Sequence, residues 1–93
     1  MIISFKQSWL EDFWHNGDHK KVPSDLKSRL IRKLDMMNAA KELKDLESPP
    51  SNHLHALHGD RQGQYAISVN GPWRLCFKIN NNEIFDIELV QYH

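Results

Sequence analysis

The second half of the chain alternates apolar and polar residues in three separate stretches. Apolar side chains occupy every second position at 65–69, 73–77 and 85–89. A period of two is typical of a strand with one buried face. Short loops rich in Asn and Gly separate the stretches, so the pattern predicts two consecutive antiparallel hairpins.

The length of each loop decides which side chains lie opposite one another across a hairpin. At 70–72, a three-residue loop pairs Ile67 with Leu75 and keeps both apolar sets on one face. A two-residue turn at 70–71 would divide these sets between the two faces, so we favour the longer loop.

The same reasoning at the next loop, 80–82, pairs Leu75 with Ile87. The apolar face is then continuous and can receive a helix, whereas the other face forms a polar concavity. In this register Arg74 lies opposite Glu88. The polar face is expected to carry Ser68, Arg74, Cys76, Lys78, Asp86 and Glu88.

The first half of the chain has the spacing of helices instead. Apolar residues at 9, 10, 13 and 14 predict a helix over 6–15, and Gly17 ends it. The main helix is expected to begin within 22–25, and a shorter helical piece is expected over 39–46. The buried stripe of the main helix comprises Leu26, Leu30, Leu34 and Met37.

Two further segments complete the predicted fold. Residues 1–5 form a short strand candidate that joins the sheet as its fourth member, with Met1, Ile3 and Phe5 on one face. The other face of the main helix is predicted to be solvated charge, with contact to phosphates or to a partner protein as the alternatives. That face carries Lys27, Arg29, Arg32 and Lys33.

Composition narrows the class of protein. The 93 residues suffice for one domain, 1–93, of the α+β class: a small antiparallel-dominated sheet with two to three helices packed on one face. The 12 basic and 12 acidic side chains cancel, so any nucleic-acid binding must come from local placement. The single cysteine, Cys76, excludes an intramolecular disulfide, and no stretch suits a signal peptide or membrane span. We therefore expect a cytoplasmic protein with no membrane partner.

Ionisable side chains gather before the first predicted hairpin and at the end of the chain. His55, His58, Arg61, Arg74 and His93 supply proton donors, proton acceptors and fixed positive charge. This combination suits in-line cleavage of an RNA phosphodiester, in which one group takes the 2′-OH proton and another protonates the leaving 5′-oxygen. The sequence contains neither a Gly-rich phosphate loop nor a serine triad.

A metal site is the alternative interpretation of these histidines. His53, His55 and His58, with His93 as a fourth member, could supply nitrogen ligands. No cysteine lies nearby, and a loop between two prolines and a strand has no period that would turn these rings toward one ion. We favour surface histidines and predict neither a metal nor a cofactor.

Three segments of the chain resemble a known family. The strings LHALHGDRQGQYAISV at 54–69 and NGPWRLCF at 70–77, with the final Tyr92-His93, resemble HigB-type toxins of the RelE/ParE superfamily. The resemblance includes the opening MIISFK and the Val-Pro pair at 22–23. It implies a compact toxin, a ribosome-dependent endonuclease that cuts mRNA in the decoding site of the small subunit.

The resemblance also implies catalytic roles at four positions. His55 and His93 match the family's two acid/base candidates. Arg74 matches the arginine of its Trp-Arg motif, and Tyr92 matches a tyrosine that packs against or hydrogen-bonds the substrate. Because its own α-carboxylate favours the protonated ring, His93 is the predicted general acid and His55 the general base.

Three more positions are predicted to bind RNA. Arg61, in Gly-Asp-Arg, matches a residue that would hold the loop or the RNA backbone. His58 stands where a lysine is common in the family, which exchanges a fixed charge for a titratable one. Gln91 stands where an aspartate is common, and a glutamine cannot act as a base.

The implied partners are the ribosome, mRNA and a HigA-type helix-turn-helix antitoxin, with operator DNA engaged only through the antitoxin. The alternative is a ParE-like toxin, which shares this fold but binds gyrase without acid/base residues. The presence of His55, Tyr92 and His93 argues against that alternative. A third interpretation is a structural subunit that engages DNA only through its antitoxin.

Overall fold

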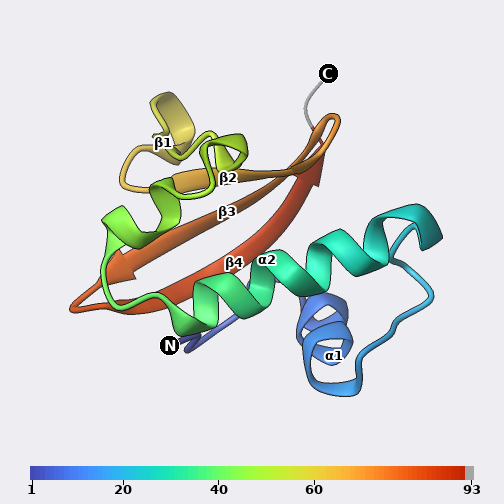
Figure 1. Ribbon diagram of the computed structural model, residues 1–93. Coiled ribbons are helices and arrows are strands. Elements are labelled where there is room, and N and C mark those ends of the chain that lie inside the picture. The colour runs from blue at the N-terminus through green and yellow to red at the C-terminus, as the bar shows by residue number, and fades with distance from the viewer. Residues whose placement is uncertain (92–93) are drawn as a thin grey trace.

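The computed structural model describes residues 1–91, so Tyr92 and His93 lie outside the described residues. Four strands form one antiparallel sheet in the order β1-β2-β3-β4, with the two α-helices on one of its faces (Figure 1). The predicted α+β class is confirmed. The elements are α1 (Ser8–Asn16), α2 (Lys27–Ala39), β1 (His55–Ala56), β2 (Tyr65–Asn70), β3 (Trp73–Asn80) and β4 (Glu83–Gln91), with the short 3₁₀ helices η1 (Ser24–Leu26), η2 (Leu43–Glu47), η3 (Pro50–Asn52) and η4 (Gly59–Arg61). None of the helices within residues 1–91 is long and apolar enough to cross a membrane.

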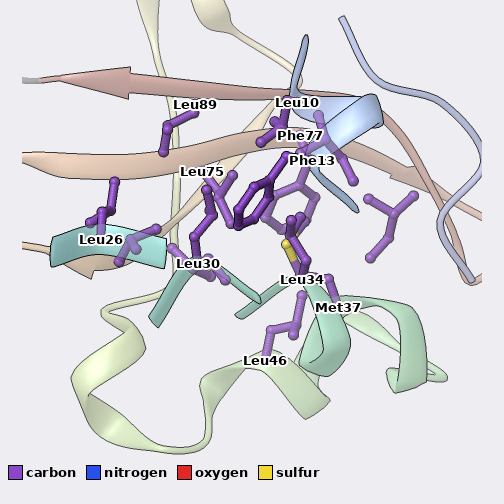
Figure 2. Packing of buried hydrophobic residues seen from close by; sticks show 14 of the residues in the cluster. Leu10, Phe13, Leu26, Leu30, Leu34, Met37, Leu46, Leu75, Phe77 and Leu89 are labelled. Carbon is purple, nitrogen blue, oxygen red and sulfur yellow. The ribbon is translucent and has the colours of Figure 1, made fainter. Parts of the chain in front are cut away.

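The predicted stripe on α2 forms the centre of the core. Leu30 and Leu34 are fully buried, and they belong to one cluster with Leu75 and Phe77 from β3 (Figure 2). Helix α1 adds Leu10 and Phe13 to the same cluster. It ends as predicted at Gly17, which adopts φ 83° and donates its N–H to the Phe13 carbonyl at 2.8 Å.

The segment after α2 departs from the prediction. The α-helix ends at Ala39 because Ala40 is extended, and the expected helical piece over 39–46 is the 3₁₀ helix η2 instead. A capping box between Glu42 and Asp45 starts that helix.

The N-terminal segment, residues 1–5, was predicted as a short strand and the fourth member of the sheet, and this prediction was wrong. Residues 1–5 make only isolated parallel bridges to β4, between Ile2 and Ile84 and between Phe5 and Ile87. The predicted facing is also wrong, since Ile2 and Phe5 pack on the core, whereas Ile3 is 44% exposed. The fourth strand of the sheet is the two-residue β1 instead.

The hairpin of β2 and β3 has the predicted register over most of its length. Ile67 lies opposite Leu75, as expected. The predicted three-residue loop was wrong, however, because Asn70 rather than Val69 pairs with Trp73. The turn is shorter, and a register shift between residues 68 and 70 absorbs the extra residue as a β-bulge.

The register of β3 with β4 was predicted wrongly. Leu75 lies opposite Leu89 rather than Ile87. The cause is a tight turn at Asn81 and Asn82, both at positive φ, followed by a bulge at Asp86 with φ 55°. Asparagine tolerates positive φ, which permits a turn shorter than the expected loop.

The bulge in β4 explains how the N-terminal segment binds to it. Residues 84 and 87 are three positions apart and both buried, because the bulge resets the alternation of side chains. The N-terminal segment follows this kink, since Ile2 and Phe5 are also three positions apart. Ser4 lies between them and its hydroxyl accepts the Asp86 N–H at 2.9 Å.

Candidate active site

Four residues form one row across the sheet, on the face opposite the helices. His55 in β1 lies opposite Ala66, Ala66 lies opposite Cys76, and Cys76 lies opposite Glu88 in β4. Directly paired residues point to the same side of a sheet. Ala66 and Cys76 are fully buried, so these two small side chains form a floor between His55 and Glu88.

Arg61 crosses this floor. Its Nη1 donates hydrogen bonds to Glu88 Oε1 at 2.9 Å and to Gln64 Oε1 at 3.2 Å. Arg61 follows β1 at one edge of the sheet and Glu88 lies in β4 at the other, so the loop with η4 must fold over the polar face. The structure thus gives Arg61 a role in holding that loop, and its contact with RNA stays a prediction.

Glu88 is a charged anchor on this face. The hydrogen bond from Arg61 is the largest cause of a lowered pKa for the Glu88 carboxyl, and partial burial opposes it. Lys6 adds a weaker attraction, with its Nζ 3.8 Å from Glu88 Oε1. The carboxylate therefore stays ionised at neutral pH and interacts with two cations, Arg61 and Lys6.

Arg74 occupies the next row of the same face. It lies opposite Ser68 on one side and Val90 on the other, so its predicted pairing with Glu88 was wrong. Its Nη1 donates hydrogen bonds to the carbonyl oxygens of Gly71 at 2.6 Å and Trp73 at 3.0 Å. The guanidinium is thus anchored at the β2–β3 turn, beside the last described residues of β4.

The ring of His55 makes a contact that favours one tautomer. Its Nδ1 lies 2.8 Å from the carbonyl oxygen of His53. A carbonyl can only accept, so Nδ1 is the donor in this contact, and Nε2 of the exposed ring is the nitrogen that can accept a proton when the ring is neutral. This arrangement suits a general base.

The structure groups some of the predicted site residues and separates others. His55 and Arg74 share the polar face, in neighbouring rows. His58 is exposed just before η4, outside both rows. Gln91 lies opposite Trp73, whose side chain packs on the core, so Gln91 is on the face away from Arg74. Tyr92 and His93 lie outside the described residues.

A metal site at these histidines, the alternative interpretation of the sequence, finds no support in the geometry of the described residues. Within residues 1–91, no three His, Cys, Asp or Glu side chains gather as metal ligands. His55 instead directs Nδ1 at a backbone carbonyl.

A small sheet with helices on one face, and a histidine and an arginine on the other, has the layout of a RelE-like toxin.

Comparison with known proteins assigns the family. The family described as RelE-like toxin of type II toxin-antitoxin system HigB matches residues 3–93, and the chain belongs to this family of HigB-like toxins. It is 38% identical over 79 residues to Toxin HigB-1 of Vibrio cholerae, covering 84% of this chain and 83% of that one. It is 31% identical to Endoribonuclease HigB of Proteus vulgaris over 93 residues, all of both chains.

Solved structures show the same fold. A YafQ mutant from Escherichia coli superposes with a TM-score of 0.65 at 14% identity, over 98% of this chain and 91% of that one. YoeB in a heterotetrameric YoeB-YefM toxin-antitoxin complex from Staphylococcus aureus gives 0.59 at 20% identity, over 100% and 95%. The predicted family and toxin class are confirmed, and the relatives favour the ribonuclease interpretation over the gyrase-binding alternative.

Proposed function

We propose that this toxin cleaves mRNA in the decoding site of the translating ribosome by acid/base chemistry without a metal. The observation that carries the proposal is that a general-base candidate, His55, and a permanently charged side chain, Arg74, lie on the same face of the sheet. The Nδ1 hydrogen bond of His55 leaves Nε2 free to accept a proton, and Arg74 lies in the neighbouring row. The relative named Endoribonuclease HigB supports the same activity.

The proposed reaction follows from these groups. Nε2 of His55 takes the proton of a ribose 2′-OH, and the 2′-oxygen attacks the adjacent phosphorus. The P–O5′ bond breaks, and His93 gives a proton to the leaving 5′-oxygen. Arg74 stabilises the charge that develops on the phosphate, and Tyr92 packs against the substrate. The products are a 2′,3′-cyclic phosphate and a 5′-hydroxyl.

Dependence on the ribosome follows from the openness of this face. His55 and His58 are both exposed, so the protein alone does not hold the 2′-OH and the phosphate in line. The decoding site would supply that order. His58 and Arg61 are proposed to contact the RNA backbone from the loop, whereas Gln91 would reach RNA only around the edge of the sheet.

The proposed partner is a HigA-type helix-turn-helix antitoxin, with operator DNA bound only through it. A YoeB toxin of the same fold has been solved with its antitoxin YefM, which supports a protein partner of this kind. The proposed place of action is the cytoplasm, where ribosomes translate.

One experiment separates this proposal from its alternative. Purified protein is incubated with an mRNA, with and without translating ribosomes, and in parallel with gyrase and plasmid DNA. We expect mRNA cleavage only with ribosomes, and unchanged supercoiling. Rapid digestion of naked RNA would contradict the ribosome dependence, and gyrase inhibition without mRNA cleavage would favour the ParE-like alternative.

A further inference from the structure

A cleft of about 410 Å³ lies where α2 faces the β2–β3 hairpin. Its charged and polar lining includes Arg29, Arg32, Lys33, His53, Ser68 and Arg74. None of the described residues that line it is an aspartate or a glutamate. In a chain whose 12 basic and 12 acidic side chains balance, the cleft is a local concentration of positive charge.

Within residues 1–91, the short first strand leaves most of β2 without a strand partner on this edge of the sheet. β1 pairs with β2 only at Tyr65 and Ala66. The rest of β2, toward Asn70, has no strand on that edge among the described residues. The cleft lies along this stretch of β2, since Ser68, Val69 and Asn70 all line it. A ligand can therefore enter it without displacing a strand.

Lys33 is the least expected member of the lining. It was predicted as solvated helix charge, yet only 9% of it is exposed. Its Nζ donates to Asn52 Oδ1, and no carboxylate in residues 1–91 pairs with it. Burial, then the nearby guanidinium groups of Arg32 and Arg29, lower the pKa of the Lys33 ammonium. A buried cation that has no counter-charge among these described residues favours a bound anion.

Asn52 holds this ammonium in a fixed place. Its side chain is fully buried, and its Nδ2 donates to the carbonyl oxygens of Leu46 at 3.0 Å and Ser48 at 3.3 Å. These bonds orient Oδ1 toward Lys33. The cation is therefore positioned before any ligand arrives, which lowers the entropy cost of binding.

Arg29 and Arg32 complete a cationic face on α2. They are three positions apart and exposed, and Lys33 is four positions from Arg29, so all three lie on neighbouring turns. Like charges at this spacing repel one another, and an anion between them would relieve that repulsion. Guanidinium groups bind phosphate oxygens in a bidentate manner.

We propose that this cleft binds the phosphate backbone of the RNA strand that the toxin cleaves. The proposal rests on the proposed function, and continuity with the active-site face favours RNA over an acidic protein segment. Arg74 and Ser68 belong both to the cleft and to the polar face. His53 lines the cleft, and its carbonyl fixes the ring of His55. A strand held in the cleft would thus continue past Arg74 to the reacting histidine.

Binding of a non-cleavable RNA tests the cleft separately from catalysis. The probe is a short fluorescent single-stranded RNA with 2′-O-methyl riboses, and anisotropy is followed over a range of salt concentrations. The variant Arg29→Gln/Arg32→Gln should bind about tenfold more weakly at low salt and lower the salt slope by about 1.4. Lys20→Gln/Lys21→Gln removes the same charge from an exposed loop outside the cleft and should change affinity less than about twofold.

Each possible result of this binding experiment either supports or overturns the assignment of the cleft to an RNA backbone. Equal affinity and slope for the two double variants would overturn it. Normal RNA binding by Arg29→Gln/Arg32→Gln, with lost binding of a glutamate-rich peptide, would overturn it in favour of an acidic protein segment. Because the probe cannot be cleaved, cleft-dependent RNA binding without mRNA cleavage on ribosomes would refute the proposed function, although the cleft would still be shown to bind an RNA backbone.

Discussion

Arg61 and Glu88 are joined by a hydrogen bond of 2.9 Å that ties the loop after β1 to β4, the opposite edge of the sheet. The side chain of Glu88 is only 18% exposed, so solvent screens this pair weakly. The bond holds η4 over the floor of Ala66 and Cys76. It therefore places the loop that carries His58 on the face proposed to receive RNA.

Breaking this pair should reduce stability in a pH-dependent way. Glu88→Gln should lower the free energy of unfolding by about 1 to 2 kcal/mol at neutral pH. Because Arg61 lowers the pKa of Glu88, the contribution is present above pH 4.5, the ordinary value, and is lost as the pH falls through the lowered pKa. Urea unfolding of both proteins at neutral and acid pH measures the difference.

Lys78→Gln is the matched control for the Glu88 variant. Lys78 pairs with Asp86 at 3.4 Å, but the two side chains are 53% and 50% exposed. Solvent screening should leave that pair with little effect on stability. An equal loss in both variants, or a Glu88→Gln loss that persists at acid pH, would show that the Arg61 contact does not stabilise the fold.

Truncation of the α2 stripe should be costly because it opens a cavity over the sheet. Leu34 is fully buried in the cluster that contains Leu75, so Leu34→Ala should cost about 2 to 5 kcal/mol. Ile3→Ala, at a residue that is 44% exposed, should cost less than about 0.5 kcal/mol. Chemical denaturation measures both, and similar losses would contradict the core described above.

Lys33 should oppose folding at neutral pH. Burial lowers its pKa, so the folded protein binds this proton less tightly than the unfolded chain does. The cost should be relieved as the pH rises from the lowered pKa toward 10.5, the ordinary value. As the pH rises over this alkaline range, the free energy of unfolding should therefore increase less for Lys33→Met than for the wild-type protein. Identical pH profiles would show that Lys33 is effectively solvated.

The spacing of apolar residues was sufficient to predict the parts of the fold in which the interacting residues are close in sequence. The stripe from Leu26 to Met37 and the pairing of Ile67 with Leu75 follow from spacing alone, and both were confirmed. The pairing of β3 with β4 was missed because it depends on a bulge at Asp86, and a two-state pattern of apolar and polar residues does not reveal positive φ. The Asn-Asn pair at 81–82 was the available signal.

The site was predictable to the extent that strand alternation determines it. Alternation placed Arg74 on the polar face, and the histidine loop before β2 put His55 beside it. The partner of Glu88 was not predictable, since Arg61 reaches it through the path of a loop. Burial of Lys33 was missed for a similar reason, because Asn52, which binds it, is 19 positions away in the sequence.

Single-turnover cleavage of an mRNA bound in the decoding site tests the role of His55 most directly. The rate for His55→Ala should fall by about 10²- to 10⁴-fold, the usual worth of one acid/base group, with thermal stability unchanged because the side chain is exposed. His15→Ala removes another exposed histidine, on α1, and should cleave at the rate of the unchanged protein. Full activity of His55→Ala on ribosomes would contradict the assignment of the general base and with it the proposed mechanism.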